Sequence, residues 1–308
     1  MIIPTARLRP VAGALIALAL IVFGVPGATS QQVAVAQSQV LFVSIVDADG
    51  EPVTDLTAEE VTVQWDGEAC ETLNLEPINW PVRVTVFVDN GEGGRQAVGQ
   101  MREGLKGFVD AIPDEVEIAI LTLARQPRWV TRHTMDRAEL AKGIDLIVPD
   151  AGAASTFMDA LIEEAGRLHD DEERQYFPVI VMVASDGTDG SNGLQRRYDE
   201  ALQRLVANSA TVHTRMLSHG NEGGLAAQVA ANVGEVTRGS HDTLALGSGF
   251  ITLLPELGQD IARKHHLVSN QYRVTYAPPD GASDQPSISI GTTRPGLNLI
   301  PTLDGNVP

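Results

Sequence analysis

Carboxylate and hydroxyl side chains follow three runs of strand-forming residues, and their types suit the binding of a cationic group. The acidic loop Asp89–Gly93 follows VRVTVFV, Ser155 and Thr156 precede a helical pattern, and Asp186 follows FPVIVMVAS. The chain of 308 residues has a formal net charge of −18, which favours a cationic ligand or a bound cation over nucleic acid or an anionic membrane surface. The alternative is an acidic surface that only maintains solubility.

Alternating strand and helix patterns between Pro81 and His266 must position these groups. VRVTVFV is a continuous apolar run, as expected of a strand buried on both faces. Between such runs, apolar residues recur every three or four positions, which is typical of helices. The alternation predicts an α/β fold with a doubly wound, mainly parallel sheet. Because ligands bind such sheets at the carboxyl ends of their strands, the three polar groups are expected to meet there.

Two short β-type segments flank the α/β region. VLFVSIVD and VTVQW lie before it, and QYRVTYAP and PSISIGTT lie after it. Each flank has about 40 residues or fewer of core-forming sequence, which is marginal for independent folding. We therefore predict that residues 37–79 and 269–308 pair into one small sandwich-like β domain, with a domain of residues 80–268 inserted between them.

Residues 1–36 have the layout of a secretory signal peptide and spacer. Arg7 and Arg9 precede the apolar run Val11–Val25, and small residues follow. The run is shorter than the roughly 20 residues of a membrane-spanning helix. We expect cleavage after Ser30 or Ala36, export to the periplasm, the cell envelope or the medium, and no membrane span in the mature chain. An uncleaved anchor is the alternative.

Cys70 is the single cysteine in the sequence. No intrachain disulfide can form, so an exported chain must be stable through its core. We predict that Cys70 is a buried apolar side chain and that it has no role as a nucleophile.

The region of residues 82–266 resembles the von Willebrand factor type A (VWA) family. The loop DNGEG lies where that family has a D-x-S-x-S loop, and SDG lies where it has its third-loop acid. The flanks are similar to those of the secreted bacterial VWFA-related group. DADGEPVTDL is similar to the D-x-x-G-x-P-V-x-x-L pattern of that group, and Tyr272 and Tyr276 are similar to its Y-x-x-x-Y segment.

The resemblance implies a metal-ion-dependent adhesion site (MIDAS), which holds Mg²⁺ or Mn²⁺ and leaves a position open for an acidic group of a partner. Hard cations of this kind prefer oxygen ligands in near-octahedral geometry. Matched residue by residue, Asp89 is the first-loop acid and Asp186 the third-loop acid. Ser155 is the best match to the second-loop hydroxyl, and Thr156 is the alternative.

The first loop departs from the family pattern. Both of its serines are glycines here, Gly91 and Gly93, so two oxygen ligands are missing. Asn90 or Glu92, a backbone carbonyl or a water could replace one of them at lower affinity. We therefore expect a degenerate site with at most weak binding of Mg²⁺ or Mn²⁺, and its metal ligands would be Asp89, Ser155 and Asp186.

We predict a binding protein that carries out no catalysis. The sequence has no G-x-S-x-G and no H-E-x-x-H motif, and GEGGRQ fails the G-x-G-x-x-G pattern. The partner is expected to be a protein or a surface ligand. One alternative is a metal-independent structural module of an envelope assembly, and another is a hydrolase whose acid pair no motif selects. The predicted contact surface consists of Asp89, Asn90, Gly91, Glu92, Gly93, Ser155, Thr156 and Asp186.

Overall fold

The computed structural model describes residues 38–302, except 194, 280, 282, 284 and 285, and it also describes residue 305. The predicted signal peptide and spacer, residues 1–36, lie outside the described residues, so the expected cleavage stays a prediction. Within the part of the chain that is described, no helix is both long and apolar enough to cross a membrane.

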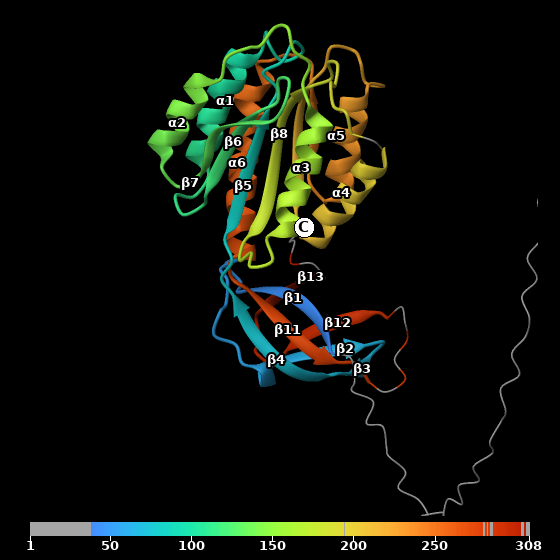
Figure 1. Cartoon of the computed structure of the whole chain (residues 1–308). Coiled ribbons are helices and arrows are strands. Elements are labelled where there is room, and N and C mark those ends of the chain that lie inside the picture. The colour runs from blue at the N-terminus through green and yellow to red at the C-terminus, as the bar shows by residue number, and fades with distance from the viewer. Residues whose placement is uncertain are drawn as a thin grey trace, which may run out of the picture. The chain divides into compact units, whose positions relative to one another are not determined.

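A six-stranded sheet forms the centre of the α/β region (Figure 1). Its strands are β5 Val82–Val88, β6 Ile118–Thr122, β7 Arg128–Thr134, β8 Phe177–Ser185, β9 Thr211–Leu217 and β10 His241–Leu244. They lie in the order β10-β9-β8-β5-β6-β7, and each neighbouring pair is parallel except β6 and β7. The predicted mainly parallel sheet is thereby confirmed.

Helices cover both faces of this sheet (Figure 1). They are α1 Val98–Ala111, α2 Arg137–Leu146, α3 Phe157–Asp170, α4 Gln195–Ala207, α5 Leu225–Val236 and α6 Gly249–Val268. Side chains of α1, α2 and α6 share one apolar core with Val84, Val86 and Val88 of β5. Side chains of α3, α4 and α5 share a second core with Phe87. Alternate residues of β5 face the two cores, so side chains on both faces of the strand are buried. This explains why the strand is apolar throughout.

The N- and C-terminal flanks form two antiparallel sheets around a third core. One sheet has the order β13-β1-β11-β4 and consists of β1 Gln39–Val46, β4 Glu71–Ile78, β11 Gln271–Ala277 and β13 Asn298–Thr302. The other has the order β12-β2-β3 and consists of β2 Val61–Trp65, β3 Glu68–Ala69 and β12 Ile288–Thr292. This confirms the predicted sandwich-like β region built from both flanks, while the domain boundaries at residues 37, 80 and 269 stay predictions. The shared core consists of Leu41, Val43, Ile45, Leu56, Val61, Val63, Tyr272, Val274 and Tyr276.

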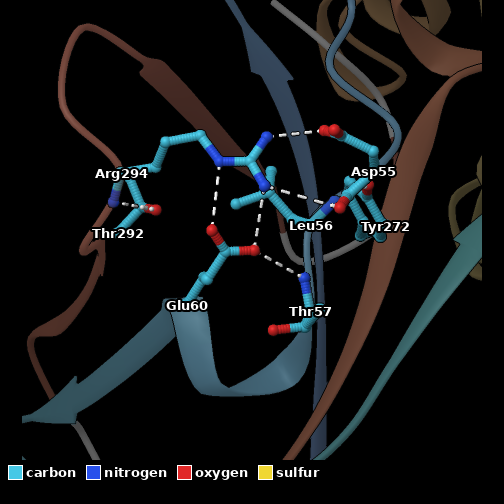
Figure 2. Close-up of polar contacts among 7 residues, drawn as sticks. All are labelled: Asp55, Leu56, Thr57, Glu60, Tyr272, Thr292 and Arg294. Carbon is cyan, nitrogen blue, oxygen red and sulfur yellow. Dashed lines mark hydrogen bonds and ion pairs between the residues drawn. The ribbon is translucent and has the colours of Figure 1, made fainter.

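A polar cluster connects the two flanks of the β region (Figure 2). The Arg294 guanidinium donates from Nε to Oε1 of Glu60 at 3.1 Å and from Nη2 to Oε2 at 3.0 Å. It also donates from Nη1 to Oδ1 of Asp55 at 2.6 Å. Beside it, the backbone N–H of Leu56 donates to the Tyr272 hydroxyl at 3.0 Å. Segments more than 200 positions apart in the sequence are therefore held together by side-chain hydrogen bonds.

Several local predictions differ from the structure. Strand β13 lies in a Pro- and Gly-rich segment for which no strand pattern was identified, and it pairs with β1. The four-residue strand β10 was also not predicted. Cys70 is half-buried and not fully buried, because it lies between β3 and β4 at the border of the β core. Burial raises the pKa of its thiol.

Candidate functional site at the carboxyl edge of the sheet

Strand register brings two of the predicted polar loops together. Val88, the last residue of β5, lies beside Val183 of the parallel strand β8, so the loops after both strands begin at the same edge of the sheet. The backbone N–H of Asp89 donates to the Val183 carbonyl at 2.8 Å. We use the term carboxyl edge for the ends of β5, β6, β8, β9 and β10 together with the loops that adjoin them.

The Asp89 carboxylate is buried and hydrogen-bonded within the protein. Asp89 is only 1% exposed. Oδ1 accepts from the backbone N–H of Gly91 at 2.9 Å, and Oδ2 accepts from the Ser185 hydroxyl at 2.5 Å. Burial raises the pKa of Asp89, and the hydrogen bonds from Ser185 and Gly91 partly offset that increase.

The two glycines of the first loop lie where a side chain has no room. A Cβ atom at Gly91 would lie 2.8 Å from the carbonyl oxygen of Ala153 and 3.1 Å from the backbone nitrogen of Ser155. A Cβ atom at Gly93 would overlap the Ser185 hydroxyl. Ser185 therefore occupies the volume of the missing side chain and supplies a hydroxyl to Asp89 from the neighbouring strand.

Ser155 and Thr156 differ in what their hydroxyls do. The Thr156 hydroxyl donates to the Leu123 carbonyl at 2.8 Å, so it is engaged at the end of β6. The Ser155 hydroxyl is shielded from solvent and has no partner at hydrogen-bond distance among the described residues. It is near enough to the Asp89 carboxylate to lower the pKa of that group slightly. Ser155, and not the alternative Thr156, is thus the free hydroxyl beside Asp89.

The Asp186 carboxylate holds the loop that follows β9. Oδ1 accepts from the backbone N–H of His219 at 2.7 Å, and Oδ2 accepts from the backbone N–H of Asn221 at 2.8 Å and from the Ser218 hydroxyl at 3.1 Å. Asp186 is 2% exposed. The His219 ring in turn places Nε2 at 2.9 Å from the carbonyl oxygen of Gly93, which connects the β9 loop to the glycine loop.

Asn90 and Glu92 do not replace the missing serines. The Asn90 amide donates to the Val148 carbonyl at 2.9 Å, and its oxygen accepts from the backbone N–H of Ala124 at 3.0 Å. Asn90 therefore joins neighbouring loops and offers no free oxygen to Asp89. Glu92 is exposed, and its backbone N–H donates to the Ala153 carbonyl at 2.8 Å.

The side chains at this edge do not fit a tight divalent-cation site. Mg²⁺ requires about six oxygens at roughly 2.0–2.1 Å in an octahedron. Asp89, Asp186 and Ser155 together offer five side-chain oxygens, fewer than the six of an octahedron, and each of the four carboxylate oxygens already accepts a hydrogen bond from the protein. Of these three side chains, as far as the described residues show, Ser155 is the one whose oxygen has no hydrogen-bond partner. Within the described residues, no group of three or more His, Cys, Asp or Glu side chains is arranged to hold a metal. The weak binding of Mg²⁺ or Mn²⁺ stays a prediction.

Three exposed apolar side chains at this edge were missed by sequence reasoning. Leu146 ends α2, Val148 follows it, and Leu246 lies in the loop between β10 and α6. Their exposed fractions are 72%, 62% and 71%. For Val148 and Leu246 the available signal was a large apolar residue between two elements, where turn residues are usual. The Ser218–Asn221 loop was also missed, because it carries no motif.

Comparison with known proteins finds similarity of fold and no closer relationship. The sequence matches no protein-family model, and no curated protein matches it. Among solved structures it is similar to a von Willebrand factor type A protein from Catenulispora acidiphila, with 13% identity, a TM-score of 0.48 and coverage of 86% of this chain and 72% of that chain. It is also similar to the conserved hypothetical protein BatB from Bacteroides thetaiotaomicron, with 12% identity, a TM-score of 0.44 and coverage of 59% and 99%.

A third similar structure is proximal thread matrix protein 1 from the mussel byssus, which was solved with zinc in its MIDAS motif. It shows 16% identity, a TM-score of 0.46 and coverage of 62% of this chain, and the match spans half of the length of that protein. Every one of these TM-scores is below 0.5, so the three structures support no statement about ligands or activity. The resemblance to the VWA family rests on the sequence patterns and on the doubly wound sheet.

Proposed function

We propose that this chain is an exported VWA-type protein that binds a partner protein through its carboxyl edge and carries out no catalysis. The observation that carries the proposal is the exposure of large apolar side chains at that edge. Among the described residues with exposed large hydrophobic side chains, Leu146, Leu246 and Val148 have the three largest exposed fractions. Apolar side chains that are this exposed are typical of protein contact sites when they gather on one surface.

The hydrogen bonds of the two acids support contact without a cation. Asp89 has partners in Gly91 and Ser185, and Asp186 has partners in the Ser218–Asn221 loop. Because protein groups donate hydrogen bonds to both buried carboxylates, we propose that the loops keep their arrangement without a metal. We therefore propose a contact that depends on apolar surface and loop shape, with at most weak dependence on Mg²⁺ or Mn²⁺.

The test compares two sets of surface substitutions in capture experiments from envelope extract. The double variant Leu146→Ser, Leu246→Ser removes apolar surface from the carboxyl edge. The matched control is Met135→Ser, since Met135 is 54% exposed and lies between β7 and α2 at the opposite edge of the sheet. The captured proteins are quantified for each variant with and without chelator.

We expect the unmodified chain and Met135→Ser to capture the partner protein in equal amounts. The double variant should capture at least about tenfold less of this protein. A tenfold loss corresponds to about 1.4 kcal/mol of binding free energy, which the loss of one apolar anchor can supply. Chelator should change the capture little. Equal capture by the double variant would contradict the proposal and would favour a structural role for the β strands, whereas capture abolished by chelator would contradict metal independence.

A further inference from the structure

A groove beside Asp186 lies between α5 and the strands β9 and β10. Its volume is about 200 Å³. Asp186 lies at the end of β8, so the groove adjoins the proposed contact surface at the carboxyl edge. The lining residues are Asp186, Met216, Ser218, Glu222, Ala227, Ala231, His241 and Thr243.

The charged groups of this groove are all acidic. Asp186 and Glu222 are its two carboxylates, and no lysine or arginine is among its lining residues. Glu222 is exposed and has no ion-pair partner among the residues that the structure describes. The nearby guanidinium of Arg215 is paired with Asp242 at 2.9 Å. The groove therefore presents negative charge without a cation to balance it.

Asp186 retains the capacity to accept a further hydrogen bond. An ionised carboxylate has about four lone-pair sites, and three of them on Asp186 are used by His219, Asn221 and Ser218. Asp186 is nearly buried, whereas Glu222 is exposed. An ammonium or guanidinium group in the groove would thus meet one exposed carboxylate and one shielded carboxylate.

The remaining walls suit an alkyl chain. Met216 is buried, and Ala227 and Ala231 lie four residues apart on α5, so both face the same side of that helix. The small alanine side chains leave room beside the strands. The His241 ring has a threonine partner at each nitrogen, Thr214 at 2.6 Å and Thr243 at 3.3 Å. Burial lowers the pKa of His241, so the ring adds no positive charge near neutral pH.

We propose that this groove binds a basic side chain, lysine or arginine, of the partner protein. The inference rests on the proposed function and deepens it, because it assigns a chemical class to the partner. The alkyl stem lies along Met216, Ala227 and Ala231, while the cationic head binds Glu222 and Asp186. A metal at an adhesion site would attract an acidic group of a partner, whereas this groove attracts a basic one.

The test uses small probes, so it does not require that the partner be known. Nα-acetyl-lysine amide and Nα-acetyl-arginine amide are titrated into the protein, and the methyl resonances of Ala227, Ala231 and Thr243 are followed by NMR. Nα-acetyl-norleucine amide is the probe with an alkyl stem and no charge. We expect both basic probes to shift these methyl resonances, and the norleucine probe to bind about threefold to fivefold more weakly, as expected for loss of an ion pair.

Two variants and a control assign the binding to the groove. Glu222→Gln should weaken binding of the lysine probe about threefold to fivefold, and Ala231→Leu should weaken it more than about tenfold by filling the groove. Glu235→Gln, on an exposed turn of the same helix, should leave it unchanged. Equal binding of the norleucine probe, or lysine binding insensitive to both groove variants, would overturn the proposal. If partner capture still depends on Leu146 and Leu246 in that case, the groove assignment fails and the proposed function stands.

Discussion

The Ser185 hydroxyl donates a 2.5 Å hydrogen bond to Oδ2 of Asp89, across 96 positions of sequence. The same hydroxyl occupies the space that a side chain at Gly93 would need. The family pattern places a hydroxyl in the first loop. Here a hydroxyl is supplied by Ser185, the last residue of β8. This relationship explains how the loop can lose its serines while the buried carboxylate keeps a hydrogen-bond donor.

A serine at Gly93 should destabilise the protein. The new side chain would collide with Ser185, and overpacking of a buried site typically costs about 1–3 kcal/mol. The double variant Gly93→Ser, Ser185→Gly removes the collision and offers Asp89 a hydroxyl from the loop, so it should recover most of the lost stability. Urea unfolding of the single and double variants measures the effect.

The control for this exchange is Gly99→Ser on α1. Gly99 has open space around its Cα atom, with no heavy atom within 4 Å of an added Cβ. Its substitution should change the unfolding free energy by less than about 0.5 kcal/mol, as for an ordinary surface change. If Gly93→Ser is as stable as Gly99→Ser, the Ser185 hydroxyl does not occupy the space beside Gly93.

The Tyr272 hydroxyl should contribute to the stability of the β region. It accepts the buried backbone N–H of Leu56 at 3.0 Å (Figure 2). Tyr272→Phe leaves that N–H without a partner, which typically costs about 1–3 kcal/mol. Tyr276→Phe is the matched control, since Tyr276 lies in the same strand and is equally buried, at 1% exposure. Equal losses in thermal unfolding of the two variants would mean that the Leu56 hydrogen bond is not responsible.

Acid should destabilise the protein through two histidines, the buried His213 and the half-buried His133. Burial, together with the charges of Arg83 and Arg167, lowers the pKa of His133 to about 3. Burial, together with the charges of Arg215 and Lys264, lowers the pKa of His213 to about 3. The pKa in the unfolded chain is near 6.5, so below that pH the unfolded state binds more protons than the folded state. Stability is therefore fully present above about pH 6.5 and is lost as pH falls toward 3.

The expected slope is about 1.4 kcal/mol per pH unit for each of these histidines below about pH 6.5. Urea unfolding between about pH 7.5 and 5.5 measures it, above the range in which carboxylates with ordinary pKa values titrate. His133→Gln should remove about half of the slope that His133 and His213 together supply. An unchanged slope in both His133→Gln and His213→Gln would show that neither ring is held neutral.

The fold could be predicted because its signals are local and repeated. The apolar run Val82–Val88 is buried on both faces of the sheet. The apolar stripes of α1 and α3 each pack into one of the two cores. Asp66 and Gly67 form the hairpin turn between β2 and β3, with positive φ at both residues, and the pair Asp-Gly is a typical sequence signal for such a turn. Strands β10 and β13 could not be predicted in the same way, because each has four or five residues and gains its hydrogen bonds from a partner distant in sequence.

The candidate site was predicted in position and only partly in detail. Asp89 and Asp186 do lie at the ends of adjacent parallel strands, as the topology requires. The orientation of each carboxylate depends on loops with no periodic pattern, so the sequence could not show that Asp186 binds the Ser218–Asn221 loop. It also could not show that Ser185 takes the place of a side chain at Gly93, because that depends on how closely the loops after β5 and β8 approach each other.

The central claim, an edge arranged by hydrogen bonds and not by a cation, is tested most directly by calorimetric titration with Mg²⁺ and Mn²⁺. The unmodified protein and Asp89→Asn are compared, since the amide keeps the shape of the side chain and removes its charge. Too few free oxygens remain to replace the water around these ions, so we predict binding no tighter than about millimolar, about 4 kcal/mol, in both proteins. Micromolar binding by the unmodified protein that is lost in Asp89→Asn would contradict the account.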